Sequence, residues 1–381
     1  MQIRTKLPKV GTTIFSVMSQ LATQHKAINL GQGFPDFDGP QSLRDALTVA
    51  MNSGKNQYAP MTGVAKLREQ IALKTEKLYG RKVSADTEIT VTSGATEALF
   101  AAIAAVVHTG EEVIVLDPCY DSYEPAIELA GGRTVHIPLR LPDFAVDWQR
   151  VRDAVTPRTR MIVINSPHNP SGATLAADDL DALAGIVRGT DIFVLSDEVY
   201  EHIIYDGLEH QSVLRHTELA ARSFVISSFG KTYHCTGWKI GYCIAPQQLS
   251  AEFRKVHQYL TFCTFAPAQS AFAEALESNP QHYLDLPAFY QAKRDRFHTL
   301  LSPSKFQLLA VKGAYFQLVD YSALSAADDL NFCEWLVREA GVAAIPVSSF
   351  YETPPDAHLV RLCFAKSDDT LAAAAERLCK L

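Results

Sequence analysis

Short apolar and β-branched runs alternate with helix-like stretches between about residue 87 and residue 245. Strand-like runs lie at residues 88–92, 112–116, 134–138, 161–165, 192–195, 224–227 and 240–245, with helical patterns at 95–107 and 176–187. Strands that alternate with helices form βαβ units, whose mostly parallel sheet is covered by helices on both faces. The pattern therefore predicts an α/β fold, in which ligands bind beyond the carboxyl ends of the strands.

The pattern of helical and strand-like segments changes after about residue 280, which indicates a second, smaller unit. Helical patterns at 287–301, 328–339 and from 370 onward alternate with strand-like runs at 315–319, 342–345 and 359–364. Thr12 and Thr13 precede a further amphipathic helix near the N-terminus. A chain of 381 residues exceeds one ordinary core. We predict a large domain of residues 38–285 and a smaller α+β domain made of residues 1–37 and 286–381.

Composition narrows the class of protein. The net charge of -7 argues against binding nucleic acid through electrostatics alone. No stretch approaches the roughly 18–20 uncharged residues of a membrane helix, so we expect no membrane partner and a cytoplasmic location. The 7 cysteines form no CxxC pair, which favours reduced thiols over a disulfide framework or a metal site. We therefore expect no metal.

The first polar cluster at a strand end is Thr92-Ser-Gly-Ala-Thr-Glu97, between a predicted strand and a predicted helix. A glycine-containing turn at a helix N-terminus directs free backbone N–H groups and a positive dipole end at one point, which suits a phosphate. A plain helix cap at Ser93 or Thr96 accounts for the segment about as well. Taken alone, this cluster leaves both interpretations open.

The second cluster is Asn165-Ser-Pro-His-Asn-Pro-Ser-Gly172, which follows another predicted strand. Two prolines and a glycine fix an irregular loop that can direct the Asn169 amide into a cleft, although a rigid turn without function is the alternative. His168 could be a metal ligand or a base, but no carboxylate or second histidine lies at ligand spacing. We do not expect direct chemistry from it.

The third cluster places Asp197 directly after the apolar run 192–195. An acid at the end of a buried strand is costly unless a cation or a strong donor lies opposite it. Its partner could be a metal, a structural arginine or a protonated ring nitrogen of a cofactor. No further ligand lies close in sequence, which weakens the metal interpretation.

The fourth cluster contains Lys231, just beyond the predicted strand 224–227 and preceded by Gly230. A lysine in a crowded, partly desolvated cleft near other cations loses its proton readily and can attack an aldehyde. Ser228 and Lys239 could then hold a phosphate. A lone lysine is usually a solvated surface residue, but three other clusters are predicted at the same sheet edge.

In this order, the segments resemble the fold-type I, class I/II pyridoxal-phosphate aminotransferases. Within that class the chain is most similar to the kynurenine/glutamine transaminase K branch, and in particular to bacterial methionine aminotransferases. The most specific motifs are Asn169-Pro-Ser-Gly172, Asp197-Glu-Val-Tyr200 and Ser228-Phe-Gly-Lys231, and the resemblance extends from Gly11 to Lys366. It implies a mixed, mostly parallel seven-stranded sheet between helices, with a smaller α+β domain.

The resemblance assigns the catalytic roles. Lys231 would hold pyridoxal 5'-phosphate covalently and move the proton during transamination. Asp197 would pair with the pyridinium nitrogen and keep it protonated. Tyr200 and Asn169 would bind the phenolic oxygen of the cofactor, and the ring of Tyr120 would stack on the pyridine.

The resemblance also assigns the phosphate site, which would consist of Ser228, Lys239, Gly94, Ala95 and Thr96. Many aminotransferases have arginine at the position of Lys239, but the kynurenine/glutamine branch also uses lysine there. Tyr58 would reach the phosphate of a neighbouring subunit. This implies a homodimer with shared active sites.

Arg361 matches the arginine that binds the substrate α-carboxylate, for which bidentate geometry suits a guanidinium. Gly33 matches a backbone position that closes over the substrate, and Asn169 also contacts it. The expected function is transfer of the α-amino group of a large neutral amino acid, with methionine preferred, to a 2-oxo acid by a ping-pong mechanism. Its partners would be amino-acid and 2-oxo-acid substrates.

Other functions stay open at this point, because fold type I also hosts racemases, decarboxylases and lyases. The main alternative is a kynurenine- or glutamine-type transaminase with cysteine-conjugate β-lyase side activity. A sensor fused to a DNA-binding module is disfavoured because the resemblance begins within about the first ten residues. No second arginine is placed by motif for a side-chain carboxylate, while Phe15, Phe34, Tyr58 and Phe350 suggest a sizeable neutral side chain.

Overall fold

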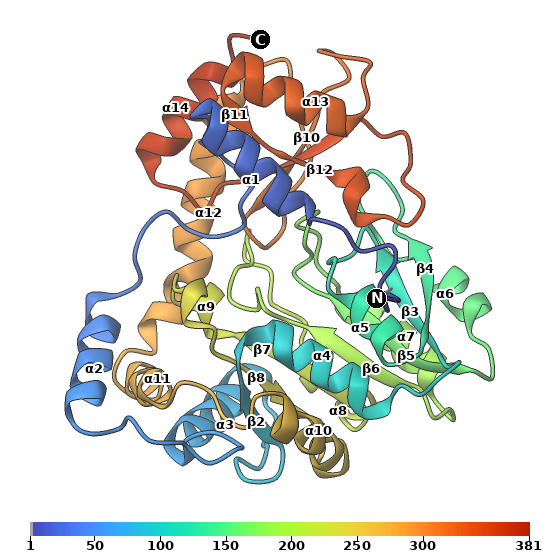
Figure 1. The fold of residues 1–381 in the computed structure, drawn as a ribbon, viewed down its shortest axis with the longest axis vertical. Helices are drawn as coiled ribbons and strands as arrows, with labels where there is room; N and C mark the ends of the chain where they lie inside the picture. Colours follow the sequence, from blue (N-terminus) through green and yellow to red (C-terminus); the bar gives the residue numbers. More distant parts are fainter. Residues whose placement is uncertain (1–2) are drawn as a thin grey trace.

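The computed structural model describes residues 3–381 and has a seven-stranded sheet between helices at its centre (Figure 1). The strands of this sheet are β2 (Ile89–Thr92), β3 (Glu112–Asp117), β4 (Arg133–Pro138), β5 (Thr159–Asn165), β6 (Phe193–Asp197), β7 (Ser223–Ser228) and β8 (Gly241–Ile244). Each of them overlaps a strand predicted from the alternating pattern. The α/β fold class is confirmed.

The order of the strands is β2-β8-β7-β6-β5-β3-β4. Pairing is parallel from β7 through β6, β5 and β3 to β4, whereas β8 runs antiparallel to both of its neighbours. β2, β5, β6 and β7 therefore all end at the same edge of the sheet. The motifs that follow these strands are brought together there.

Alternation along the buried strands explains how the sheet packs on both faces. Ile114 and Val194 belong to one hydrophobic cluster, whereas their sequence neighbours Val115 and Leu195 belong to the other. Helices α4 (Gly94–Val106), α5 (Tyr123–Leu129) and α10 (Gln247–Leu260) cover one face. The other face is covered by helices that include α2 (Gln41–Asn52), α3 (Ala65–Tyr79), α7 (Ala177–Val187) and α11 (Ala266–Ser278). Shorter helices are α6 (Trp148–Ala154), α8 (Thr217–Ala220) and α9 (Phe229–Thr232).

The C-terminal part of the chain forms a smaller unit with the N-terminal segment (Figure 1). Its antiparallel sheet has the order β12 (Ile345–Pro346), β13 (Leu359–Cys363), β10 (Phe316–Asp320) and β9 (Gln307–Leu308). β1 (Ile28–Asn29) pairs in parallel with β11 (Val342–Ala343). The helices of this unit are α1 (Ile14–His25), α12 (Gln281–Leu301), α13 (Asp329–Trp335), the π-helical turn η3 (Leu336–Ala340) and α14 (Asp368–Leu378). The predicted α+β composition and the contribution of the N-terminal segment are both present.

The helix predicted from residue 287 begins earlier, at Gln281, so that prediction was wrong by six residues. Pro287 lies inside α12 and removes one backbone donor, which normally ends or kinks a helix. Tyr283, Leu286 and Tyr290 are buried on both sides of the proline, and this packing outweighs the local preference. The domain boundary proposed at residue 285 falls within this helix, and the two-domain division stays a prediction.

The single strand predicted at 342–345 is two short strands in different sheets. β11 pairs with β1, whereas β12 pairs with β13. Ala344, between them, is fully buried, so the run is apolar throughout and its pattern does not mark the change of sheet.

Among residues 3–381, no helix has the length and apolar character needed to cross a membrane.

Candidate active site

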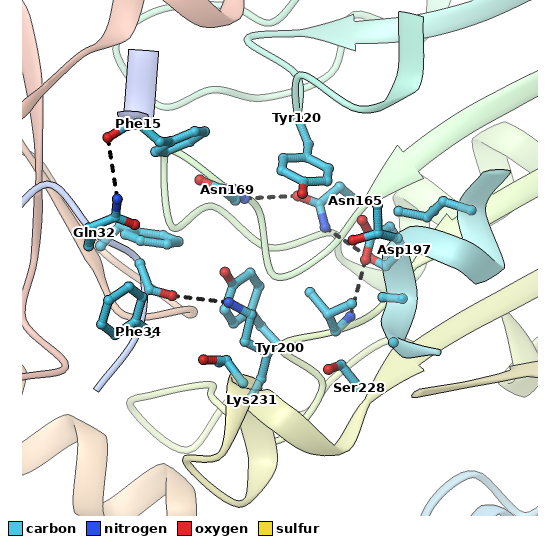
Figure 2. Close-up of a pocket in the computed structure, with 18 of the residues that line it drawn as sticks. Phe15, Gln32, Phe34, Tyr120, Asn165, Asn169, Asp197, Tyr200, Ser228 and Lys231 are labelled. Carbon is cyan, nitrogen blue, oxygen red and sulfur yellow. Dashed lines mark hydrogen bonds between the residues drawn. The ribbon is translucent and has the colours of Figure 1, made fainter. Parts of the chain in front are cut away.

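The carboxyl ends of the central strands open into a cavity of about 280 Å³, which also contacts the smaller unit (Figure 2). This volume is close to the lower end of the range typical of small-molecule sites. The predicted residues that line it are Gly33, Gly94, Ala95, Thr96, Tyr120, Asn169, Asp197, Tyr200, Ser228, Lys231, Lys239 and Arg361. Of the residues predicted to bind cofactor or substrate, only Tyr58 lies elsewhere.

Lys231 lies in α9, directly after β7, where its side chain enters the cavity. Its Nζ donates to the carbonyl oxygen of Gly33 at 3.0 Å and lies 5.5 Å from the ring centroid of Tyr200. Burial lowers the pKa of Lys231 from the ordinary value of 10.5 to about 8, and the nearby Arg361 acts in the same direction. The amine is therefore much closer to its neutral, nucleophilic form at physiological pH than a surface lysine.

Asp197 ends β6 and is 3% exposed. Its Oδ2 accepts from the Tyr123 hydroxyl at 2.7 Å, and its Oδ1 accepts from the Val199 backbone N–H at 3.3 Å. Burial raises the pKa of Asp197 to about 6, although these two donors favour the charged form. A buried carboxylate at the wall of a cavity is suited to a cationic N–H of a bound ring.

The predicted phosphate site combines the N-terminus of α4 with two side chains. Gly94 begins α4 with φ +73°, in the left-handed region, and a Cβ there would meet Lys239 at 3.3 Å. Lys239 itself has φ 53° and directs its Nζ to 3.4 Å from Oγ1 of Thr96. Ser228 ends β7 and lines the same part of the cavity. Free helix N–H groups, a hydroxyl and an ammonium together form an anion site.

Gly241 supports this phosphate site and was not predicted from the sequence. It pairs with Thr92 on one side and with Ser228 on the other. A Cβ on Gly241 would lie 2.8 Å from the Ala95 backbone nitrogen, and 2.8 Å from the carbonyl carbon of Gly94 and the oxygen of Ser227. Only glycine allows the first residues of α4 to lie this close to β8.

Arg361 lies in β13 and is 1% exposed. It donates from Nη1 to Oδ1 of Asn169 at 2.7 Å and from Nη2 to the Gly31 carbonyl at 2.8 Å. Its guanidinium carbon lies 4.1 Å from the ring centroid of Phe316. Within residues 3–381 it forms no ion pair, and its Nε has no hydrogen-bond partner. A buried cation with only neutral acceptors favours an incoming carboxylate.

Asn169 and Tyr200 line the cavity between Arg361 and Lys231. Because arginine can only donate, the Asn169 atom that faces it must be the amide oxygen, and the NH₂ group points the other way. The ring of Tyr200 packs edge to face against Tyr315, with centroids 5.1 Å apart. Burial raises the pKa of Tyr200, so its hydroxyl is a proton donor.

Some predicted residues are not in the cavity. Tyr58 is 84% exposed. Phe350 is buried, and its ring packs against that of Phe15 with centroids 5.8 Å apart. His168 is buried, and its Nδ1 lies 2.7 Å from the hydroxyl of Ser171. Burial lowers the pKa of His168 to about 4, so the ring is neutral and supports the loop.

Two tyrosines contribute to the site without having been predicted. Tyr123, the first residue of α5, donates to Asp197. Its place three residues after Tyr120 was the only signal for it in the sequence. Tyr315 donates to the carbonyl of Gly33 at 2.7 Å, the same oxygen that Lys231 contacts. Nothing in the sequence connects residue 315 with residue 33.

The chemistry of these groups fits pyridoxal phosphate. The partly neutral amine of Lys231 suits its aldehyde, and the buried Asp197 suits its ring nitrogen. The cradle at Gly94, which a Cβ would fill, suits its phosphate. Arg361 is left for the carboxylate of an amino acid.

A family model for class I and II aminotransferases matches residues 25–378. The chain therefore belongs to this family, whose members depend on pyridoxal phosphate, and it is a PLP-dependent aminotransferase. The fold-type I architecture expected from the sequence is confirmed.

The curated relatives cover nearly the full length of the chain. Methionine aminotransferase of Escherichia coli is 56% identical, over 99% of this chain and 98% of the relative. The probable N-succinyldiaminopimelate aminotransferase of Mycobacterium tuberculosis is 42% identical, over 98% and 97%. Kynurenine–oxoglutarate transaminase 1 of mouse is 34% identical, over 95% and 93%. The expected branch of the family is thus confirmed.

The structure is similar to the crystal structure of YbdL from Escherichia coli, for which a methionine aminotransferase function was identified. The TM-score is 0.98 at 56% sequence identity, and the match covers 100% of both chains. The arrangement of strands and helices is thus shared throughout the chain.

We predict that the rate of pyridoxal phosphate binding to the apoprotein rises with pH and levels off above about pH 8. The neutral amine is the reactive form, and a pKa lowered to about 8 makes it predominate above that pH rather than above 10.5. Stopped-flow absorbance at constant cofactor measures this rate, with a free alkylamine as the control for titration of the cofactor. A rate that keeps rising towards the ordinary lysine value would contradict the prediction.

We also predict that Gly241→Ala weakens cofactor binding by roughly tenfold or more, because loss of one hydrogen bond to a charged phosphate costs about 1.5–3 kcal/mol. The new Cβ meets only backbone atoms, at 2.8 Å, so the first residues of α4 must move. Gly237→Ala is the matched control, since nothing lies within 4 Å of a Cβ there. Equal dissociation constants for the two variants, measured by fluorescence titration, would refute the role of Gly241.

Proposed function

We propose that this enzyme transfers the α-amino group of a large neutral amino acid, with methionine preferred, to a 2-oxo acid by a ping-pong mechanism. The observation that carries the proposal is the charge pattern of the cavity. Its described lining contains three cations, Lys231, Lys239 and Arg361. Cofactor aldehyde, cofactor phosphate and substrate α-carboxylate use all three, so no cation is left for a second carboxylate.

Bound pyridoxal phosphate supplies an electron sink that stabilises negative charge at the substrate Cα. Asp197 keeps a proton on the ring nitrogen, held in place by Tyr123 and Val199. Ser228, Lys239 and the N–H groups of Gly94, Ala95 and Thr96 bind the phosphate. Asp197 at one end and the phosphate-binding groups at the other would hold the ring and orient it towards Lys231.

The amine of Lys231, once released by substrate, removes the proton from Cα. Its lowered pKa suits a general base that works near neutral pH. Tyr200 and the NH₂ group of Asn169 donate towards the phenolic oxygen, and Tyr120 packs on the ring. Arg361 binds the α-carboxylate bidentately beside Asn169, which orients Cα.

The substrate side chain would lie against Phe15, Phe34 and Leu99, which line the cavity. Gln32 donates through Nε2 to the Phe15 carbonyl at 3.3 Å and to the Ser19 hydroxyl, so its NH₂ group is occupied. An apolar wall supports a flexible thioether or an aromatic side chain, for which dispersion contacts are favourable. The 56% identical methionine aminotransferase supports methionine as the preferred donor.

A kynurenine- or glutamine-type transaminase with β-lyase side activity is the second candidate. Aromatic residues at the mouth, with Phe34 45% exposed, give room for a larger ring. Relatives of that activity are less similar, at 34% identity in mouse. Relative turnover of kynurenine, glutamine and methionine separates the two proposals.

The enzyme is further proposed to be a homodimer with shared active sites. Exposed large apolar side chains lie at Tyr58, at the end of α10 and in the segment that follows it, namely Tyr58, Tyr259, Leu260, Phe262 and Phe265. The rings of Tyr58 and Phe262 pack edge to face with centroids 5.4 Å apart. Exposed apolar patches of this kind are typical of protein interfaces. Tyr58 would then reach the phosphate of the partner.

The proposed function predicts that methionine alone converts the bound cofactor, so that its visible absorption band falls and returns on addition of a 2-oxo acid. Lys231→Ala should slow this conversion by at least about 100-fold, the usual contribution of a general base. Lys77→Ala, which removes an exposed lysine of α3, is the matched control. The measurement is absorbance of the purified holoenzyme.

Conversion by kynurenine or glutamine but not by methionine would keep the mechanism and replace the donor. A wild-type protein that binds no pyridoxal phosphate would overturn the proposed site as a whole.

The dimer proposal predicts a mass of twice 41.9 kDa in light scattering. It also predicts that Tyr58→Phe weakens cofactor binding by about tenfold, because a hydrogen bond to a charged phosphate contributes about 1.5–3 kcal/mol. Tyr259→Phe removes the hydroxyl of another exposed tyrosine and should leave the dissociation constant unchanged. A monomer with full cofactor affinity would rule out shared sites.

A further inference from the structure

A buried acid behind the phosphate site has no role in the proposed transamination chemistry. Glu201 follows Tyr200 directly and is 5% exposed, yet it does not line the active-site cavity. Its Oε1 accepts from Nζ of Lys74 at 2.7 Å and from the hydroxyl of Tyr242 at 2.8 Å. An ion pair this deep in the protein costs desolvation of both groups and adds little stability. Stability alone therefore does not account for its presence next to a cofactor site.

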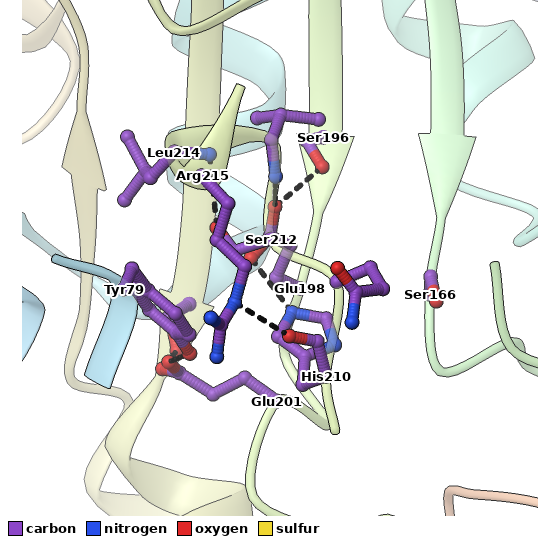
Figure 3. A network of polar contacts seen from close by, with 12 residues as sticks. Tyr79, Ser166, Ser196, Glu198, Glu201, His210, Ser212, Leu214 and Arg215 are labelled. Atoms are coloured by element: carbon purple, nitrogen blue, oxygen red, sulfur yellow. Dashed lines mark hydrogen bonds and ion pairs between the residues drawn. The ribbon is translucent and has the colours of Figure 1, made fainter. Parts of the chain in front are cut away.

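The other bonds of Glu201 lead to the segments that hold the phosphate. Its Oε1 also accepts from the hydroxyl of Ser227, the residue before Ser228. Its Oε2 accepts from the hydroxyl of Tyr79 (Figure 3). Lys74 in turn donates to the hydroxyl of Tyr242 at 2.7 Å. These donors are all buried side chains, so water does not compete for the carboxylate.

Tyr242 connects the network to the rest of the phosphate site. In the sheet it pairs with Ser227 of β7 on one side and with Val91 of β2 on the other. Its neighbour Gly241 carries the close contact with the first residues of α4. A single carboxylate thus joins the end of β7, the strand β8 beside it and, through α3, the helix layer behind them.

Within this network, Lys74 and Glu201 form a charged pair. Burial alone would raise the pKa of Glu201, but the ammonium of Lys74 and the hydrogen bonds hold the pKa well below its usual range. Glu201 therefore accepts from all its donors as a carboxylate across the working pH range. Charge-assisted hydrogen bonds are about twice as strong as neutral ones, so the Ser227 hydroxyl is held firmly.

We propose that Glu201 is a positioning residue for the cofactor phosphate: by holding Ser227 and Tyr242 it sets the positions of Ser228 and of the first residues of α4. It touches neither substrate nor cofactor. This inference rests on the proposed function, in which Ser228, Lys239 and the N-terminus of α4 bind the phosphate. Its loss should weaken cofactor binding and disturb the phosphate environment, with a much smaller effect on kcat at saturating cofactor.

The test uses two serines of the same strand. Ser227→Ala removes the hydroxyl bound to Glu201, whereas Ser223→Ala removes an equally buried hydroxyl at the other end of β7, which donates to the Leu219 carbonyl at 2.6 Å. We expect the dissociation constant of pyridoxal phosphate to rise about tenfold in Ser227→Ala and to be unchanged in Ser223→Ala. The phosphorus NMR signal of the bound phosphate should shift only in Ser227→Ala, at similar melting temperatures.

Glu201 itself is tested with its partner. Glu201→Gln alone leaves Lys74 as an unpaired buried cation and threatens folding, so the variant used is Lys74→Met with Glu201→Gln. We expect this double variant to fold, to show the same shifted phosphorus signal and to bind the cofactor about tenfold more weakly. A wild-type dissociation constant in the folded double variant would overturn the proposal.

Equal effects of Ser227→Ala and Ser223→Ala on cofactor binding would also overturn it, because they would indicate general weakening of the sheet. These outcomes differ from failure of the proposed function, in which the wild-type protein itself would not bind pyridoxal phosphate.

Discussion

The site depends on the register of β8 between β2 and β7. This strand runs antiparallel to both neighbours and places Gly241 opposite Thr92 and Ser228 at once. The missing side chain lets the backbone at Gly94 and Ala95 approach to a distance that any Cβ would prevent. That contact brings the first N–H groups of α4 next to Ser228, at the proposed phosphate site.

The charged side chains that line the cavity divide it into distinct regions. Lys239, which is exposed, and the helix N-terminus form a hydrated anion site, while Asp197 is a buried anion whose hydrogen-bond donors keep it in place. Arg361 is a buried cation enclosed by Phe15, Phe316 and Phe350. Lys231 lies between these regions, and burial removes much of its preference for the charged form. The arrangement orients a ligand with three separate charges without any change in the fold.

Much of the large sheet could be predicted from the sequence, because its strands are apolar runs bounded by turns. The residues at the strand ends could be predicted as well, because an ionisable group directly after a buried strand, such as Asp197, is costly unless it binds a partner. Contacts between distant segments could not be predicted in this way. The pairing of Gly241 with two strands, the bond from Tyr315 to Gly33 and the position of Pro287 within α12 all depend on tertiary packing that overrides or is absent from local patterns.

The two ends of the cavity are built differently, and this difference bears on how the enzyme works. The proposed phosphate end is built on the large sheet and the start of α4, and it is supported from behind by the buried pair of Lys74 and Glu201. The proposed carboxylate end is assembled from separate segments, since Arg361 lies in the smaller sheet but donates to Asn169, in the loop after β5, and to the carbonyl of Gly31. Each of those acceptors is neutral, so a substrate carboxylate can replace them with little loss. In the proposed reaction, a cofactor that stays bound would thus be held by a rigid framework, whereas substrates that enter and leave in each half of the reaction would be held by contacts that exchange easily.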